Sequence, residues 1–190
     1  DLVEEVGRIY GYTEIPIHHS AAATVMQGDP EMSFSLQRAK ELLVDRGFQE
    51  VITYSFISQE MHDRMDPEHA TVELANPISA DMSIMRTSLW PGLLQTAVYN
   101  QSRQQGRVRI FESGLRFVRK SSDIMQDPML AGLISGDISG EQWGEAARGV
   151  DFFDLKGDLE AILALTGSAA DFSFVSGEHP SLHPGQAARV

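Results

Sequence analysis

The chain has 190 residues, of which 42% are hydrophobic and 22% are charged, as in an ordinary soluble globular domain. It contains no cysteine, which excludes disulfides and thiolate-bound metals, and no apolar run reaches the roughly 18 residues of a membrane span. The net charge of -12 and the pI near 4.8 argue against an independent nucleic-acid-binding domain, because phosphate contacts need a basic surface.

The first thirty residues are expected to be separate from the rest. Residues 1–10 follow a helical pattern that stops near Gly11, and residues 13–30 contain Pro16, Gly28 and Pro30, which are typical of a linker. We therefore predict a boundary that divides residues 1–30 from a main domain at 31–190. The missing initial Met and the stop at Val190, within an expected strand, suggest that both ends were cut from a longer protein.

The main domain begins with a predicted helix over residues 33–46. Ser33 can cap this helix, its apolar residues fall on one side, and Gly47 suits its end. Phe34 lies off the apolar stripe, which leaves open either an exposed aromatic or a second buried surface. Further predicted helices follow Ser58, span 89–101 with Ser88 as the cap and Pro91 in the first turn, and begin at Asp151 and end before Gly167.

Alternating apolar residues predict strands at 49–57, 71–74, 107–112, 115–119, 128–137 and 171–175, with another beginning after 183–185. Ser113-Gly114 between two of these predicts a tight hairpin turn. Strands joined by hairpins, with helices interspersed unevenly, indicate an α+β fold with a mainly antiparallel sheet flanked by helices. A regular alternation of strands and helices is missing, so a doubly wound parallel sheet is not expected.

Short segments with a recognisable order and spacing run along nearly the whole chain. They are Asp1–Val6 with Arg8–Tyr12, Gly47–Phe56, Asn76–Ser79, Met85–Leu89, Tyr99–Gln101, Phe111–Gly114, Asp154–Gly157 and His183–Gly185. Each segment alone is weak evidence of kinship, but together the segments resemble the β subunit of the bacterial phenylalanyl-tRNA synthetase family.

This resemblance implies a class II aminoacyl-tRNA synthetase-like core that is truncated at its C-terminus and preceded by the end of another domain at 1–30. The family's active site lies on a separate α subunit, so the region would be a non-catalytic structural and interface domain. The implied partners are the α subunit, a second αβ pair and, through the whole complex, tRNA(Phe). The implied enzyme is a cytoplasmic α2β2 ligase that joins phenylalanine to tRNA with ATP, and the helix at 33–46 with its following strand resembles the class II interface motif.

Asp1, Glu4 and Glu5 share one face of the first predicted helix, because they stand at i, i+3 and i+4. Carboxylates suit Mg²⁺, which needs only a few protein ligands besides water. The same pattern also fits a capping box and the preference of acids for a helix start. The resemblance favours the metal: it implies a Mg²⁺ site at these three positions plus an upstream Asp outside the chain, and hence weak or absent binding by the chain alone.

The segment from Arg107 to Arg119 stands where class II enzymes hold ATP, according to the resemblance. Active members carry Arg-x-Glu on the first strand, whereas here Arg109 and Glu112 are separated by two residues. An arginine fork can clamp a phosphate, but a structural hairpin with solvated arginines is the preferred interpretation. The second ATP motif, Gly-x-Gly-x-x-Arg, is not found.

The histidines show no zinc spacing, so solvated or locally hydrogen-bonded rings are expected at positions such as His62, His69 and His183. Phosphate-binding glycine loops and Gly-x-Ser-x-Gly are also absent. We predict no catalytic and no cofactor-binding residue in the chain. Two alternatives remain: an active class II adenylate-forming enzyme, and an acidic protein-interaction domain unrelated to translation.

Overall fold

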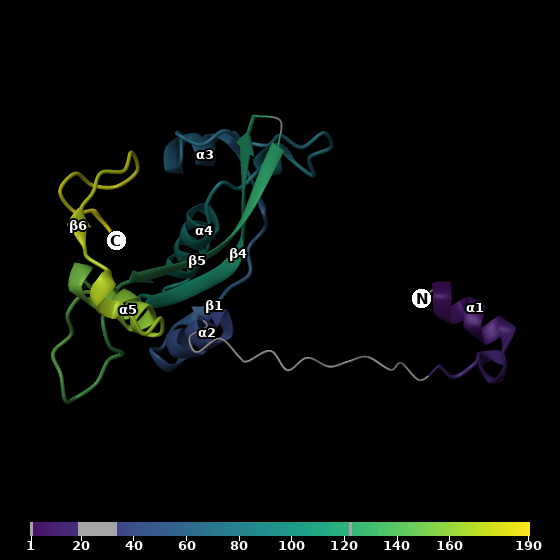
Figure 1. Cartoon of the computed structure of the whole chain (residues 1–190). Helices are drawn as coiled ribbons and strands as arrows, with labels where there is room; N and C mark the ends of the chain where they lie inside the picture. The colour runs from purple at the N-terminus through teal and green to yellow at the C-terminus, as the bar shows by residue number, and fades with distance from the viewer. Residues whose placement is uncertain (1, 19–33, 122) are drawn as a thin grey trace. The chain divides into compact units, whose positions relative to one another are not determined.

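The computed structural model describes residues 2–18, 34–121 and 123–190 (Figure 1). The chain divides into two compact units, residues 1–31 and residues 32–190, which are described separately below. In the first unit, α1 (Leu2–Tyr10) is followed by the 3-10 turn η1 (Tyr12–Glu14). Gly11 ends the helix with a φ of 98°, a conformation that glycine adopts without strain. The predicted first helix is therefore confirmed.

The second unit contains both helices and strands. The helical elements are α2 (Leu36–Asp45), α3 (Gln59–Met65), η2 (Ala80–Met82), α4 (Trp90–Gln101), α5 (Phe152–Ala164) and η3 (Ala169–Asp171). The strands are β1 (Gln49–Glu50), β2 (Phe56–Ile57), β3 (Ile84–Met85), β4 (Val108–Lys120), β5 (Asp123–Ser135), β6 (Val175–Ser176) and β7 (Ala188–Arg189).

The largest sheet has the strand order β1-β4-β5. β4 and β5 are antiparallel over their whole length, whereas β1 runs parallel to β4. The pairs β2-β3 and β6-β7 are also antiparallel. The expectation of an α+β fold with mainly antiparallel pairing is confirmed in this general form.

The predicted hairpin turn at Ser113-Gly114 is wrong. Residues 108–120 form one continuous strand, and the chain reverses only after Lys120, which pairs with Asp123. The predicted strands 107–112 and 115–119 are therefore two parts of β4, and the strand expected at 128–137 is the second part of β5. Gly114 is needed for a different reason: a Cβ there would overlap the Arg86 guanidinium, which packs against the strand.

The strand predicted at 49–57 is present only at its ends, as β1 and β2. Between them the chain follows β4 for one more residue, where the Val51 amide donates to the Phe111 carbonyl at 2.8 Å, and then leaves the sheet. The strand predicted at 71–74 is reduced to a bridge between Glu73 and Ile84. Of the strand predicted at 171–175, Asp171 is the last residue of η3, and strand pairing begins only at Val175.

The helix starts show which caps the sequence identifies correctly. The helices expected after Ser58 and from Asp151 are confirmed: Ser58 caps α3, and Asp151 forms a capping box with Asp154 on α5. α2 is capped by Ser35, while the predicted cap, Ser33, lies outside the described residues. Ser88 does not cap α4: Leu89 is the N-cap residue, and the Ser88 hydroxyl is buried without a hydrogen bond in the part of the chain that the structure describes.

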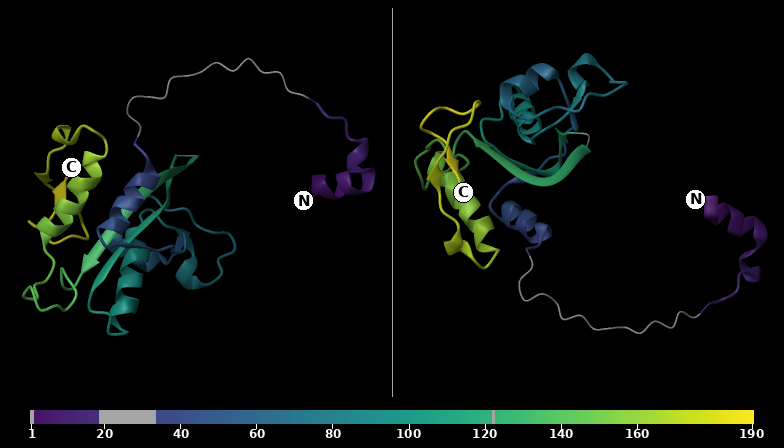
Figure 2. Two further views of the ribbon diagram at one scale, coloured as in Figure 1. Left: turned by 90° about the horizontal axis from the view of Figure 1, so that it is seen from below. Right: turned by 45° about the horizontal axis from the view of Figure 1, so that its top comes forward.

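The core lies on both faces of the β4-β5 hairpin (Figure 2). On one face, Val108 and Ile110 pack against Leu93 and Ala97 of α4. On the other face, Phe111 packs with Leu43, Phe48 and Ile162 from the region of α2 and α5. Side chains alternate along a strand, so consecutive residues of β4 enter different parts of the core. Among the described residues, no helix is long and apolar enough to cross a membrane.

Candidate functional site

The face of β4 toward α4 carries a buried ion pair. Arg86 and Glu112 are 3% and 2% exposed, and the Arg86 Nη1 donates to Glu112 Oε1 at 2.7 Å. The Thr53 hydroxyl donates to the other carboxylate oxygen at 2.8 Å and accepts from Arg86 Nη1 at 3.1 Å. Arg86 Nε donates to the Leu115 carbonyl at 3.0 Å. The charges are therefore paired and hydrogen-bonded, which is the condition for burying them.

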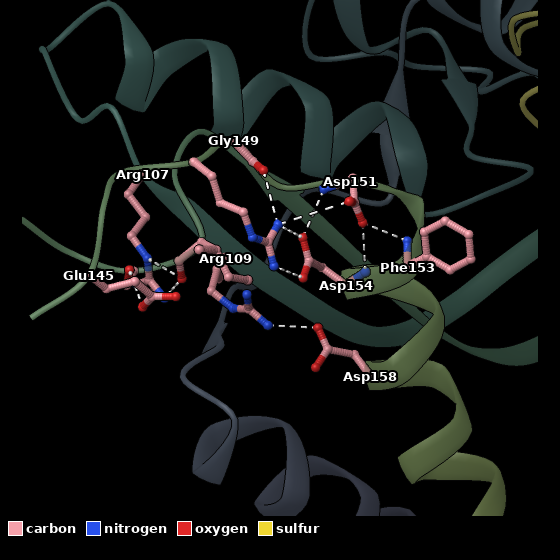
Figure 3. Close-up of polar contacts among 11 residues, drawn as sticks. Arg107, Arg109, Glu145, Gly149, Asp151, Phe153, Asp154 and Asp158 are labelled. Carbon is pink, nitrogen blue, oxygen red and sulfur yellow. Dashed lines mark hydrogen bonds and ion pairs between the residues drawn. The ribbon is translucent and has the colours of Figure 1, made fainter.

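The opposite face of β4 carries a second buried cluster, drawn in Figure 3. Arg109, which is 8% exposed, donates from Nη2 to Asp158 Oδ2 at 2.6 Å. The other oxygen of Asp158 accepts from Arg46 Nε, also at 2.6 Å. The Arg109 guanidinium also lies 4.6 Å from the centre of the Phe48 ring. This cluster joins α2, β4 and α5, which are distant in sequence.

These two clusters show how the spacing of Arg109 and Glu112 places their side chains. Residues three apart on a strand point to opposite faces, whereas residues two apart share a face. The Arg-x-Glu spacing of active class II enzymes would therefore put both groups on one side, and the spacing in this chain separates them. The expectation of solvated arginines is wrong for Arg109, which is buried and paired, although Arg107 and Arg119 are exposed.

The start of α5 is held by a surface ion pair. Arg148 donates two hydrogen bonds to the Asp154 carboxylate, both at 2.7 Å (Figure 3). Arg148, together with the Asp151 backbone N–H, lowers the pKa of Asp154 to about 2 from its ordinary 3.8. The same bond raises the pKa of Arg148 above its already high value. The pair therefore joins the end of the loop from 136 to 149 to the first turn of α5.

A third polar network surrounds Thr87. Its hydroxyl donates to Asp66 Oδ2 at 2.6 Å and lies 3.3 Å from the Nδ1 of His62, which is 4% exposed. His69 Nδ1 lies 2.6 Å from the other oxygen of Asp66. The expectation of locally bonded histidines holds for His62 and His69, but His62 is buried rather than solvated. Among the described residues, no group of three His, Cys, Asp or Glu could hold a metal ion.

The residues predicted to bind Mg²⁺ are only partly described. Asp1 lies outside the described residues. Glu4 and Glu5 are exposed on α1, and Glu5 Oε2 accepts from Arg8 Nη2 at 2.5 Å. Carboxylate oxygens are suitable Mg²⁺ ligands, but the Glu5 carboxylate is already paired with Arg8.

Large apolar side chains are exposed on the segment after β1 and on α4. The exposed fractions are 92% for Ile52, 67% for Tyr54 and 57% for Tyr99. Tyr54 and Tyr99 line a shallow cavity of about 410 Å³. Phe34, which precedes α2, is also half exposed. Exposed aromatic residues grouped around a hollow are typical of protein interfaces.

Comparison with known proteins gives the family. Residues 15–190 match the family described as "Phenylalanyl tRNA synthetase beta chain CLM domain". Relatives named "Phenylalanine--tRNA ligase beta subunit" include those of Hahella chejuensis, 53% identical, and Methylococcus capsulatus, 56% identical. Each match covers 100% of this chain and 24% of the relative, so the chain spans about a quarter of their length.

Among solved structures, that of PylSc, a pyrrolysyl tRNA synthetase of Desulfitobacterium hafniense, shows some similarity. The match has a TM-score of 0.49 and 18% identity, and it covers 76% of this chain and 49% of that one. This similarity is too low to assign the fold. The family match and the identities above 50% are sufficient on their own: the chain belongs to the phenylalanyl-tRNA synthetase β-chain CLM domain family.

Proposed function

We propose that residues 31–190 are the non-catalytic core of the β subunit of a cytoplasmic phenylalanine–tRNA ligase, and that residues 1–30 belong to the end of another domain of that subunit. In this proposal the core has a class II synthetase-like fold, and the intact α2β2 enzyme charges tRNA(Phe) with phenylalanine using ATP. The observation that carries the non-catalytic role is the division of Arg109 and Glu112 between opposite faces of β4, each neutralised by a buried partner.

Phosphate binding by Arg109 would require its release from Asp158. The buried Asp158 carboxylate would then lose one of its two cations. Breaking a buried ion pair costs on the order of 3–5 kcal/mol. The second candidate, an active adenylate-forming enzyme, is therefore disfavoured. The chain should show no phenylalanine-dependent exchange of pyrophosphate into ATP, and measurable exchange by the purified chain would contradict the proposal.

The subunit-binding role rests on the exposed apolar residues near α2 and α4. We expect Ile52 and Tyr54 to be buried against the α subunit, because exposed aromatic and aliphatic anchors supply much of the binding energy of interfaces. The double variant Ile52→Ser, Tyr54→Ser should weaken binding of the chain to the purified α subunit by about 30-fold or more, measured by calorimetry. Ile124→Ser, on the exposed end of β5, is the matched control. Equal affinity of the two variants would refute this surface.

The Mg²⁺ site belongs to the proposal for the intact subunit. Asp1, Glu4 and Glu5 would supply carboxylate ligands there, and an upstream acid would complete the set. The chain alone should bind Mg²⁺ weakly, with a dissociation constant no tighter than roughly 1 mM, since Mg²⁺ is reluctant to give up its waters for few ligands. Calorimetric titration tests this, with Glu4→Gln, Glu5→Gln as the comparison. Micromolar binding by the unchanged chain would disprove it.

A further inference from the structure

The loop between β5 and α5 is closed at its base and extends beyond the end of α5 in Figure 1. Two backbone hydrogen bonds close the base. The Val150 amide donates to the Gly136 carbonyl at 2.9 Å, and the Ile138 amide donates to the Arg148 carbonyl at 3.0 Å. Residues 139–147 are therefore presented as a compact surface loop whose two ends lie close together.

Trp143 stands in the outer part of this loop. Its side chain is fully exposed, more than any other large apolar side chain among the described residues. The side chains beside it bond to one another instead, since Gln142 Nε2 and Ser139 Oγ donate to Glu145 Oε2 at 3.2 and 3.5 Å. Tryptophan is mostly buried in proteins and is enriched among the residues that dominate the binding energy of interfaces. A fully exposed indole on a closed loop therefore favours an anchor for another macromolecule.

The charges around Trp143 decide which class of macromolecule fits. Glu141 and Glu145 stand two residues before and two residues after it, and both are exposed. Arg148 is the only basic residue between β5 and α5, and it donates two hydrogen bonds to the Asp154 carboxylate at 2.7 Å. The carboxylates beside the indole would repel the phosphates of a nucleic acid. A second copy of this chain, with a net charge of -12, would also bring like charges together.

The position of the loop points to the surface that is proposed to bind the α subunit. The loop leads into α5, and α5 lies beside α2, where Asp158 accepts from Arg46 Nε at 2.6 Å. Phe34, which precedes α2, is half exposed and belongs to that surface. A partner that covers the surroundings of α2 is therefore the one most able to reach the loop as well.

We propose that Trp143 is an interface anchor that enters an apolar pocket bordered by lysine or arginine on the α subunit. Glu141 and Glu145 face those cations, so that burial of the indole supplies affinity and the carboxylates supply orientation. This inference rests on the proposed function, which supplies the α subunit.

Fluorine NMR of the full-length β subunit containing fluorotryptophan tests the proposal, with Trp143→Phe to identify the signal of this residue. The difference in chemical shift between H2O and D2O should be large for the β subunit alone, because the ring is in water, and should fall when the α subunit is added. An equally exposed signal in the complex would overturn the proposal. So would a signal already shielded in the β subunit alone, or one that is shielded by tRNA(Phe) and not by the α subunit.

Trp143→Ala in the full-length β subunit should weaken its binding to the α subunit by about 30-fold. Gln142→Ala, at the adjacent exposed position, is the matched control and should leave the affinity unchanged. Equal affinities of the two variants would refute the anchor. If the unchanged β subunit binds the α subunit and only the anchor test fails, the proposed function stands; if the unchanged subunits do not associate, the proposed function itself fails.

The charge reversal Glu141→Lys, Glu145→Lys tests the pocket border. It should lower the association rate constant with the α subunit by about 10-fold at low ionic strength, and the difference from the unchanged subunit should shrink as salt is added. A rate constant that stays the same or rises would mean that no cations face these carboxylates, and it would overturn the assigned pocket.

Discussion

β4 and β5 are partners along their whole length, yet they lie in different environments. The first five residues of β4 are all buried, whereas most of the first half of β5 is exposed and its second half is only partly buried. The first five residues of β4 have β-strand neighbours on both edges and helices over both faces, so the charged residues among them, Arg109 and Glu112, are held as buried pairs. Among the described residues, β5 has a neighbouring strand on one edge. The comparison shows that position in the sheet, rather than composition, decides which strand contains the core and the buried ion pairs.

The largest effect should follow from breaking the buried pair on β4. Glu112→Ala leaves the Arg86 guanidinium buried without its carboxylate, so the free energy of unfolding should fall by about 3–5 kcal/mol. The matched control is Glu50→Ala, which removes an ion pair with Lys40 near the surface and should cost about 0–1 kcal/mol. Urea unfolding of both variants measures the difference. Similar losses would mean that burial of the pair is unimportant.

A direct comparison of the strands uses two residues that face each other, Ile110 on β4 and Leu133 on β5. Ile110→Ala should cost about 2–5 kcal/mol, because the residue is almost fully buried. Leu133→Ala should cost less than this in the 190-residue chain, since its side chain is only partly covered. Equal losses of unfolding free energy for the two variants in the 190-residue chain would contradict the view that β4 contains more of the core than β5.

A smaller effect is expected at Gly114. Ala at this position would overlap the Arg86 guanidinium and should lower the free energy of unfolding by about 1–3 kcal/mol. Gly140→Ala is the control, because no atom lies near the place of its Cβ, and it should change stability by less than about 0.5 kcal/mol. A harmless Gly114→Ala would show that Arg86 can move away from β4 without cost.

The smallest effect should come from the surface pair at the start of α5. A lowered pKa means that ionised Asp154 stabilises the fold above its ordinary value of 3.8, and this contribution is lost as the pH falls to about 2. The stability difference between the unchanged chain and Asp154→Asn should therefore narrow over that interval. Urea midpoints measured against pH test this, with Asp123→Asn as the control. A difference that is constant with pH would contradict the role of Arg148.

Local sequence signals correctly identified most of the helices and the family. Ser58, Asp151 and Pro91 fix helix starts through bonds or backbone angles that involve only nearby residues, so they are readable without the fold. The failures occurred where a distant residue determines the structure. Gly114 has the sequence features of a turn, but Arg86, 28 residues earlier, is what requires a glycine there. Ser88 has the features of a cap, but its hydroxyl is buried and accepts or donates no hydrogen bond among the described residues.

The sequence by itself determined the composition class, the α+β pattern and the resemblance that the family match confirms, because these depend on residue types and their order. Only the tertiary structure showed that Arg109 and Glu112 lie on opposite faces of β4, with Asp158 and Arg86 as their partners. These features arise from contacts between segments distant in the chain, and short-range periodicity contains no information about which distant segments meet.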